Sequence, residues 1–174
     1  MTLLYPADNL MIMDYNRVIK SLNDLSVEQF LEALEENFTV RPLADGESTK
    51  VEARHTYSLF IRGKWYKMAI KPEKIDFSTP VSQLDSQIIT EMILSPILGI
   101  QDIKRDPRID FVGGIRGHAG LEQRCSQDCV AAIALCPIKI EELLDVADAD
   151  LIMPPKSTWF EPKPRSGFVV RVFE

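Results

Sequence analysis

The segment Met153–Gly167, with the sequence MPPKSTWFEPKPRSG, holds the densest mixture of cationic, hydroxyl and aromatic side chains in the chain. Four of the eleven prolines lie in it. Because proline fixes φ and removes a backbone donor, the segment can be neither a helix interior nor a central strand. Three positive residues and one negative residue give it a net charge of +2, within a chain whose net charge is −6. We therefore expect a stiff loop that faces an anion.

The polar side chains of this basic loop are of the types that bind phosphate. Lysine, arginine and hydroxyl groups donate hydrogen bonds to phosphate oxygens, and a glutamate could orient a lysine or act as a base. The alternative is a rigid loop whose charges are solvated and contribute little. The candidate ligand-binding residues here are Lys156, Ser157, Thr158, Glu161, Lys163 and Arg165.

A second candidate is the glycine loop Phe111–Gly120, FVGGIRGHAG. A strand that runs through glycines into a helix lets backbone N–H groups point at an anion, and the helix dipole adds to the attraction. The candidate residues are Gly113, Gly114, Gly117 and Arg116, whose guanidinium could bind a phosphate or carboxylate through two hydrogen bonds. The pattern is neither G-x-G-x-x-G nor a Walker A loop, so it has little specificity. A turn that needs glycine, next to an exposed arginine, is the favoured alternative.

A third candidate is Asp14–Arg17, DYNR, at one end of the first extended segment. Asn16 and Arg17 could join the two loops if the strands run suitably. A polar strand end is the favoured alternative. The chain offers no defensible pair of nucleophile and base, so we do not expect it to catalyse a reaction alone, and no catalytic residue is assigned.

The bulk composition limits the class of protein. A chain of 174 residues with 45% hydrophobic and 26% charged residues suits a single globular domain. Its net charge of −6 argues against general nucleic-acid binding, and no apolar run reaches membrane-spanning length. The first residues contain no basic region of a signal peptide, so cytoplasm is the expected compartment.

The three cysteines do not indicate a metal site. Cys125, Cys129 and Cys136 are odd in number, so at least one cannot pair within the chain. The two histidines, His55 and His118, have no ligand motif around them, and we expect no metal. Free cysteine usually behaves as a small apolar residue.

The elements that must position these candidates follow from apolar spacing and turn signals. A helix begins after Ser26, with Gln29 as its capping-box partner, and its apolar residues recur at helical spacing. Further helices are expected over Val81–Leu94, around Gly120–Cys125, and with Ile140, Leu143, Leu144 and Ala147 on one side. Strands are expected over Leu10–Ile19, Thr39–Pro42, Ile109–Val112, Val130–Leu135 and Phe168–Phe173.

A β-hairpin completes this arrangement. Tyr57, Leu59 and Ile61 alternate with other residues, Gly63-Lys64 is the expected turn, and Trp65–Ile70 returns. The last third reads strand–helix–strand–helix–strand, which predicts β-α-β units on one sheet. We therefore predict an α+β fold: a mixed β-sheet with packed helices, including the hairpin and a C-terminal β-α-β-α-β segment.

Several phrases resemble a family of bacterial and archaeal proteins. They are RIDFVGGIRG, MPPKSTWFEPKPRSG, GKWY and SPILGI, and they resemble the domain-of-unknown-function family one-zero-one-five, in order and over nearly the whole chain. Its members are usually about twice as long, so the resemblance implies that residues 1–174 form one α+β domain equivalent to their C-terminal half. The N-terminal half of such proteins carries a D-G-H-H-R-like signature similar to ParB-like proteins, among them an ADP-dependent serine kinase. This sequence has no such motif, and Asn16 stands where the family more often has histidine.

Two functions remain open. The first is the anion- or phosphate-binding half of a nucleotide- or phosphate-using enzyme, in which Arg116, Lys156 and Lys163 point into one cleft; phosphate or a nucleotide is then the expected ligand. The second is a non-catalytic interaction or oligomerisation module, marked by an exposed apolar patch near Trp159. The possible partners are the N-terminal half of the family protein or a second copy of the chain; we expect no nucleic acid and no membrane.

Overall fold

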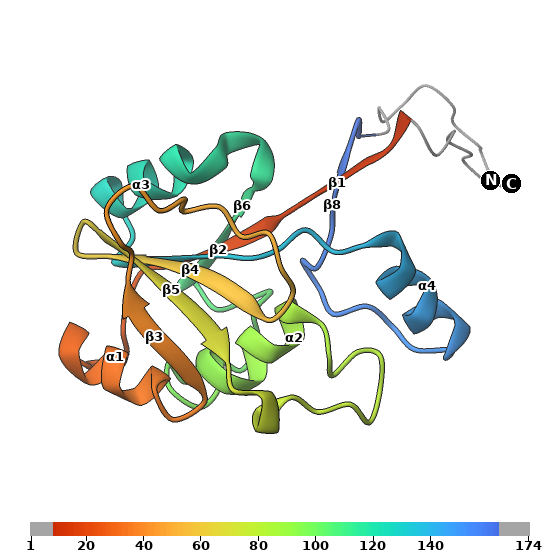
Figure 1. The fold of residues 1–174 in the computed structure, drawn as a ribbon, viewed down its shortest axis with the longest axis horizontal. Coiled ribbons are helices and arrows are strands. Elements are labelled where there is room, and N and C mark those ends of the chain that lie inside the picture. The colour runs from red at the N-terminus through yellow and green to blue at the C-terminus, as the bar shows by residue number, and fades with distance from the viewer. Residues whose placement is uncertain (1–8, 164–174) are drawn as a thin grey trace, which may run out of the picture.

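The computed structural model describes residues 9–163 and consists of a twisted six-stranded sheet with helices on both faces (Figure 1). The strand order is β3-β5-β4-β7-β2-β6, and β1 and β8 form a separate two-stranded sheet. The strands are β1 (Met11–Met13), β2 (Tyr15–Ile19), β3 (Phe38–Pro42), β4 (Thr56–Ile61), β5 (Lys64–Ile70), β6 (Ile109–Gly113), β7 (Ala131–Ala134) and β8 (Trp159–Glu161).

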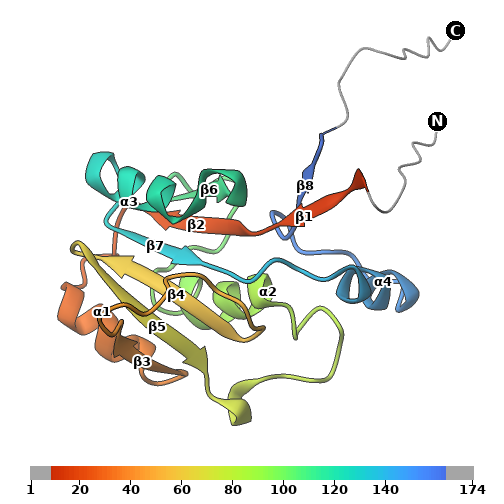
Figure 2. The same ribbon diagram turned by 45° about the horizontal axis from the view of Figure 1, so that its top comes forward.

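The helices form two layers around the large sheet (Figures 1 and 2). One layer holds α1 and α2, whose apolar residues share the larger core cluster with one sheet face, and α3 covers the other face. The helical elements are α1 (Val27–Leu34), the 3-10 turn η2 (Pro72–Lys74), α2 (Asp85–Ile89), the π-helical η3 (Thr90–Leu94), the 3-10 turn η4 (Gly114–Arg116), α3 (Gly117–Gln127) and α4 (Ile140–Asp148). Within the described residues, no helix is long and apolar enough to cross a membrane.

This arrangement confirms the predicted α+β fold and its β4–β5 hairpin. Each hydrogen-bonded strand pair is antiparallel. Strands β6 and β7 both pair with β2, so they run parallel to each other, and α3 connects them as a β-α-β unit. The predicted last strand, Phe168–Phe173, lies outside the described residues.

Helix α1 follows its predicted start. The Ser26 hydroxyl accepts a hydrogen bond from the Gln29 N–H (3.1 Å), and the Gln29 side chain accepts one from the Ser26 N–H (2.8 Å). This capping box satisfies two backbone donors that the first turn leaves open. Phe30 and Leu34 are then fully buried, so the apolar stripe of the helix faces the core as its spacing indicates.

Two predicted boundaries were wrong. Ile61 pairs with Lys64, so the hairpin turn is Arg62-Gly63 rather than Gly63-Lys64, and both residues have positive φ (49° and 71°). The helix expected over Val81–Leu94 begins at Asp85 instead. Before it, the side chains of Thr79 and Ser82 each accept a hydrogen bond from the other's backbone N–H, which competes with helix formation.

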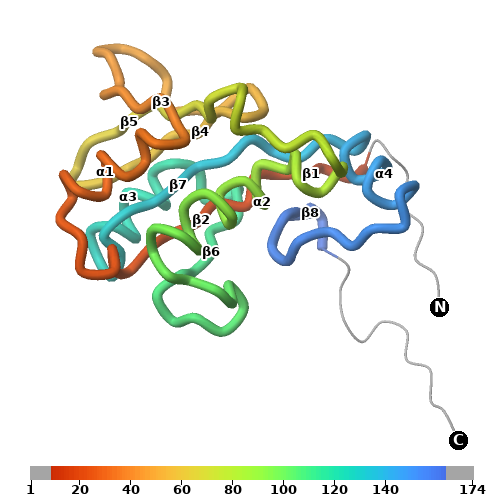
Figure 3. The backbone as a smooth tube through the Cα atoms, turned by 90° about the horizontal axis from the view of Figure 1, so that it is seen from below, coloured from red at the N-terminus to blue at the C-terminus, as the bar shows by residue number. Residues whose placement is uncertain are grey.

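Helix α4 leaves much of its apolar side exposed. Ile140 and Leu144 are 45% and 50% exposed, and the helix buries Glu142 and Val146. The reason is an ion pair: Arg54 Nε lies 2.8 Å from the Glu142 carboxylate, and this attraction holds that side of the helix inward. Figures 1 and 3 show α4 beyond the end of the large sheet, on the side where β1 and β8 pair.

The basic loop contains a short strand. Strand β8 pairs with β1, and Trp159 lies opposite Met13. The residues of β8 lie between Pro155 and Pro162, where no proline interrupts the pairing. The small sheet therefore fixes the loop beside the start of β2.

Candidate functional site

A narrow cavity lies between the start of β2, the N-terminus of α2 and the basic loop. Its volume is about 20 Å³, which is room for one water-sized group, so a ligand would enter by a single atom or a terminal group. The polar residues that line it are Tyr15, Arg17, Asp85, Ser86, Glu142 and Ser157.

Arg17 is the most unusual of these residues. Residues alternate across a strand, so Val18 packs on the α3 side and Arg17 faces the α2 side, where it is 1% exposed. Its Nη1 group donates to the Tyr15 carbonyl, but Nε and Nη2 have no partner among the described residues. Burial lowers the Arg17 pKa to about 10, so the side chain is still a cation at neutral pH.

Asp85 lies on the same cavity at the first turn of α2. One of its oxygens, Oδ1, accepts hydrogen bonds from the Tyr57 hydroxyl (2.8 Å) and the His55 N–H (2.9 Å). The carboxyl is 9% exposed, and this burial raises its pKa to about 6, against the lowering by those two hydrogen bonds. Asp85 therefore exchanges a proton near neutral pH.

Glu142 brings a second carboxylate to the cavity, but its oxygens are already used. Oε1 lies 2.8 Å from Arg54 Nε in an ion pair, and Oε2 accepts a hydrogen bond from the Lys139 N–H at 2.9 Å. The charge of Glu142 is thus compensated by these two partners. Within the described residues, Arg17 forms no direct ion pair.

The basic loop reaches the cavity through Ser157. Its hydroxyl donates to the Pro154 carbonyl (2.7 Å) and lies 2.9 Å from the Ser86 hydroxyl. The neighbouring Lys156 is exposed, and its Nζ lies 5.7 Å from the centre of the Tyr15 ring. A hydroxyl pair and an ammonium group therefore stand beside the buried guanidinium.

The basic loop and the glycine loop meet at Trp159. A Cβ atom on Gly113 would lie 2.6 Å from the indole ring, so only glycine allows this contact without a shift. Lys163 Nζ lies 3.3 Å from the centre of that ring, and Glu161 accepts a hydrogen bond from the indole N–H at 2.7 Å. These two charged side chains gather on Trp159 and do not line the cavity.

The other predicted site residues have different surroundings. Asn16 is fully buried, and its side chain accepts a hydrogen bond from the Leu135 N–H (3.0 Å), which extends the β2–β7 pairing. The Gly114 N–H donates to the Asp14 carbonyl at 2.8 Å. Arg116 is exposed at the start of α3 and is not among the cavity-lining residues.

The last three predicted site residues are Gly117, Thr158 and Arg165. Gly117 has φ +57°, a left-handed conformation that favours glycine, with open space where a Cβ would stand. Thr158 is half-buried in the basic loop. Arg165 lies outside the described residues.

Sequence reasoning missed the carboxylates of the site. Asp85, Ser86 and Glu142 all lie in the first turn of a helix, where such residues normally satisfy backbone donors. Only the fold shows that they surround a buried cation. The cysteines were read as ordinary thiols, and all three are free; burial raises the pKa of Cys125 to about 12. Within the described residues, no group of three His, Cys, Asp or Glu could hold a metal ion.

Residues 1–87 match the profile of a family described as protein of unknown function (DUF1015). The fold is similar to a mutant of a free serine kinase in complex with AMP, with a TM-score of 0.52 and 17% sequence identity over 91% of this chain and 56% of that one. It is similar to a mutant of the kinase in complex with ADP (TM-score 0.51, 15% identity) and to the kinase in complex with AMP (TM-score 0.51, 16%), each over 91% of this chain and 56% of that one. The chain thus spans little more than half the length of these kinases. No curated protein matches the sequence.

Proposed function

Since the chain belongs to the family of proteins of unknown function DUF1015, we propose that it binds the phosphate group of a phosphorylated small molecule, such as a nucleotide, at Arg17. In this proposal the chain supplies the ligand-binding part of a nucleotide- or phosphate-using protein and does not catalyse a reaction alone.

The observation that carries this proposal is the guanidinium of Arg17, which is buried and has a hydrogen-bond partner for only one of its three nitrogens within the described residues. An ion taken out of water loses a large hydration energy unless a counter-charge or a full set of hydrogen bonds replaces it. Arg17 has one hydrogen bond, to the Tyr15 carbonyl, and two free donors, Nε and Nη2. These two N–H groups lie on one edge of the planar guanidinium, the edge that binds two oxygens of a phosphate or carboxylate.

Neighbouring groups favour phosphate over a simple carboxylate. Ser86 and Ser157 add hydroxyl groups beside this edge of the Arg17 guanidinium, and Lys156 adds a positive charge at the surface. A phosphate has oxygens left over for such donors after two of them have bound an arginine, whereas a carboxylate has none. Because the cavity admits one water-sized group, the phosphate would insert an oxygen and keep the rest of the ligand outside.

The similarity of fold to a serine kinase that binds AMP and ADP supports a nucleotide as the ligand. In that case Trp159, Lys163 and the glycine loop, with Arg116, would contact the nucleoside or the outer phosphates. These contacts extend the proposal from the cavity to the adjoining surface.

Isothermal titration of the full chain with inorganic phosphate, AMP and ADP tests the proposal. We expect saturable binding that Arg17→Met weakens at least about 100-fold, because two charge-assisted hydrogen bonds contribute about 1.5–3 kcal/mol each. Methionine keeps much of the apolar stem, so the pocket should hold its shape. Arg105→Met, which removes an exposed arginine outside the cavity, is the matched control and should bind as the native chain does. Unchanged affinity in Arg17→Met would contradict the proposal.

A second candidate function is an interaction module, and the exposed side of α4 favours it. Ile140 and Leu144 are about half exposed, and Ile152, shortly after the helix, is 87% exposed. The chain spans 56% of the similar kinase chains, so a longer family protein has further chain to cover such a surface. We propose that this further chain is the occupant.

Light scattering after size exclusion tests this second candidate. The native chain should be a monomer, and a separately expressed N-terminal half of a longer family member should bind it. Leu144→Glu should abolish that binding, and Glu141→Gln, on the exposed surface of the same helix, should not. A native dimer that Leu144→Glu converts to a monomer would identify a second copy as the occupant instead.

A further inference from the structure

The two carboxylates of the cavity differ in whether an oxygen remains free to accept a hydrogen bond. Both oxygens of Glu142 have partners: Oε1 forms an ion pair with Arg54, and Oε2 accepts a hydrogen bond from the Lys139 backbone. Asp85 uses only Oδ1, for Tyr57 and the His55 N–H. Among the described residues, none donates a hydrogen bond to Asp85 Oδ2. The cavity is thus lined both by a residue with two free N–H donors and by a residue with a free carboxylate oxygen.

The free donors of Arg17 and the free oxygen of Asp85 together restrict which anion fits the cavity. An oxygen with negative charge would be attracted to Arg17 and repelled by an ionised Asp85, at short range in a poorly hydrated cavity. An oxygen that carries a proton can instead donate a hydrogen bond to Asp85 Oδ2. Sulfate carries no proton at neutral pH, whereas inorganic phosphate keeps at least one P–OH group, and a phosphate monoester, which loses its last proton with a pKa near ~6, carries one on part of the population.

On the basis of the proposed phosphate site, we infer that Arg17 and Asp85 together select a protonated phosphate. Arg17 Nε and Nη2 donate to its unprotonated oxygens, and Asp85 Oδ2 accepts the hydrogen bond of its P–OH group. The selected ligand class is inorganic phosphate or a phosphate monoester with a free terminal phosphate, to the exclusion of sulfate and of phosphodiesters.

The charges that face Asp85 agree with a shared proton. Arg17 of β2 favours the ionised carboxylate, as do the Tyr57 hydroxyl of β4 and His55 just before it, whereas Glu142 of α4 and burial favour the protonated form. Burial dominates, and the pKa of Asp85 rises to about 6. This value is close to that of a phosphate monoester, so one proton can lie between the two groups at modest cost.

The test compares phosphate with sulfate, which have the same shape and differ in the proton. Titration calorimetry on the full chain at pH 8, where Asp85 is ionised, should give inorganic phosphate at least about 100-fold tighter binding than sulfate, since the ionised carboxylate accepts the P–OH hydrogen bond and repels an unprotonated sulfate oxygen. Asp85→Asn should bring the two affinities within about threefold, because the new amide can donate to a sulfate oxygen. Its carbonyl oxygen still accepts from Tyr57 and the His55 N–H, so the variant should fold. Glu91→Gln, an exposed carboxylate change in the adjoining η3, should leave the ratio unchanged.

The same measurement in the native chain does not depend on that variant. Between pH 6 and pH 8 the phosphate-to-sulfate ratio should rise at least about tenfold, because Asp85 loses the proton that it could donate to a sulfate oxygen, whereas inorganic phosphate keeps a P–OH group. Equal affinities for the two anions, or a ratio constant with pH, would overturn this inference and leave the Arg17 phosphate site intact. Binding of neither anion would overturn the proposed function as well.

Discussion

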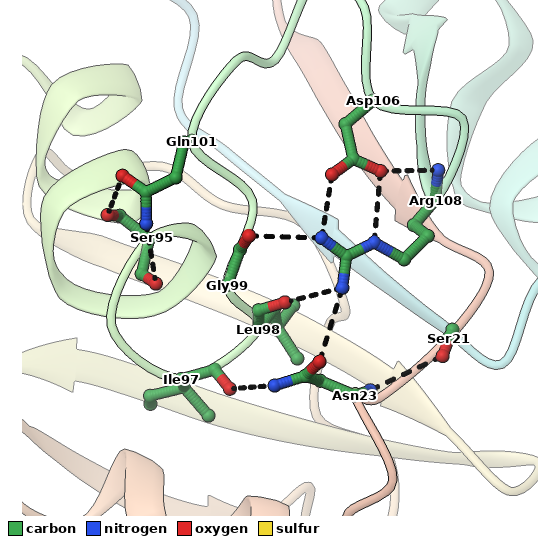
Figure 4. A network of polar contacts seen from close by, with 9 residues as sticks. All are labelled: Ser21, Asn23, Ser95, Ile97, Leu98, Gly99, Gln101, Asp106 and Arg108. Atoms are coloured by element: carbon green, nitrogen blue, oxygen red, sulfur yellow. Dashed lines mark hydrogen bonds and ion pairs between the residues drawn. The ribbon is translucent and has the colours of Figure 1, made fainter.

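Two arginines, one on a strand of the sheet and one next to the neighbouring strand, have opposite surroundings. Arg108, immediately before β6, donates to Asp106 through Nε (3.0 Å) and Nη2 (2.7 Å), and to the carbonyls of Leu98 (2.9 Å) and Gly99 (3.0 Å) (Figure 4). Arg17 of β2, the strand that pairs with β6, is more deeply buried and makes one hydrogen bond. The less exposed guanidinium is thus the one with fewer partners.

The difference separates a structural role from a ligand-binding one. Arg108 connects the loop after η3 to the start of β6, and also donates to the Asn23 side chain (3.3 Å), so its donors hold three segments together. Arg17 holds nothing together with Nε and Nη2. A buried cation that contributes no cross-links is costly to stability, and a bound anion is what would offset that cost.

The largest effect on stability is expected at Arg108. Arg108→Met removes the hydrogen bonds to Asp106 and leaves the Leu98 and Gly99 carbonyls without these donors, so the melting temperature should fall by about 5–10 °C. Differential scanning calorimetry checks this value, with Arg105→Met as a control that removes an exposed arginine. A change as small as in the control would mean that the loop is held by other contacts.

A second effect concerns Asp85 and pH. Its pKa rises from 3.8 to about 6 on folding, so the folded protein binds the proton more tightly than the unfolded chain. The contribution is present in full below about pH 4 and is lost as pH rises to about 6, for a total near ~3 kcal/mol. Urea unfolding of the native chain and of Asp85→Asn should therefore show a difference in unfolding free energy that changes between pH 4 and pH 7.

The unfolding free energy of Asp85→Asn must be subtracted from that of the native chain, because other carboxylates change the pH dependence of stability in the opposite direction. The pKa of Asp106 is lowered by its hydrogen bonds with Arg108, and hydrogen bonds with Arg124 lower that of Asp128. Their contributions are lost as pH falls, and they cancel when the variant is subtracted from the native chain. A difference that is constant with pH would show that Asp85 has an ordinary pKa.

The sequence predicted the local elements well and the cavity poorly, for one physical reason. The capping box at Ser26 and the alternation in the hairpin depend on residues close in sequence, and both were confirmed. The inward side of α4 depends on Arg54, which is remote in sequence, and apolar spacing within the helix does not indicate it. Local pattern cannot show which distant charge a helix will meet.

The candidate site shows the same limit. Arg17 was identified as a candidate from its place in a polar strand end, but the strand pattern gives no sign that it is buried without partners. The glycine loop and the basic loop were expected to share a site, and the structure brings Gly113 against Trp159. Asp85 and Glu142 were not among the candidates, and their position in the first turn of a helix gives no sign of a ligand.

The smallest effect is also the one most specific to the comparison: Arg17→Met should stabilise the protein where Arg108→Met destabilises it. Replacing a buried, poorly paired ion by an apolar side chain of similar length is often favourable by 1–4 kcal/mol. Here the lost Tyr15 hydrogen bond and the 5.5 Å cation–π contact with Phe111 reduce the gain to about 1–2 kcal/mol, a rise of about 3–5 °C in melting temperature. Calorimetry in an anion-poor buffer measures it, and phosphate should then stabilise the native chain more than the variant. A variant less stable than the native chain in that buffer would place Arg17 with Arg108, among the residues that hold the fold together.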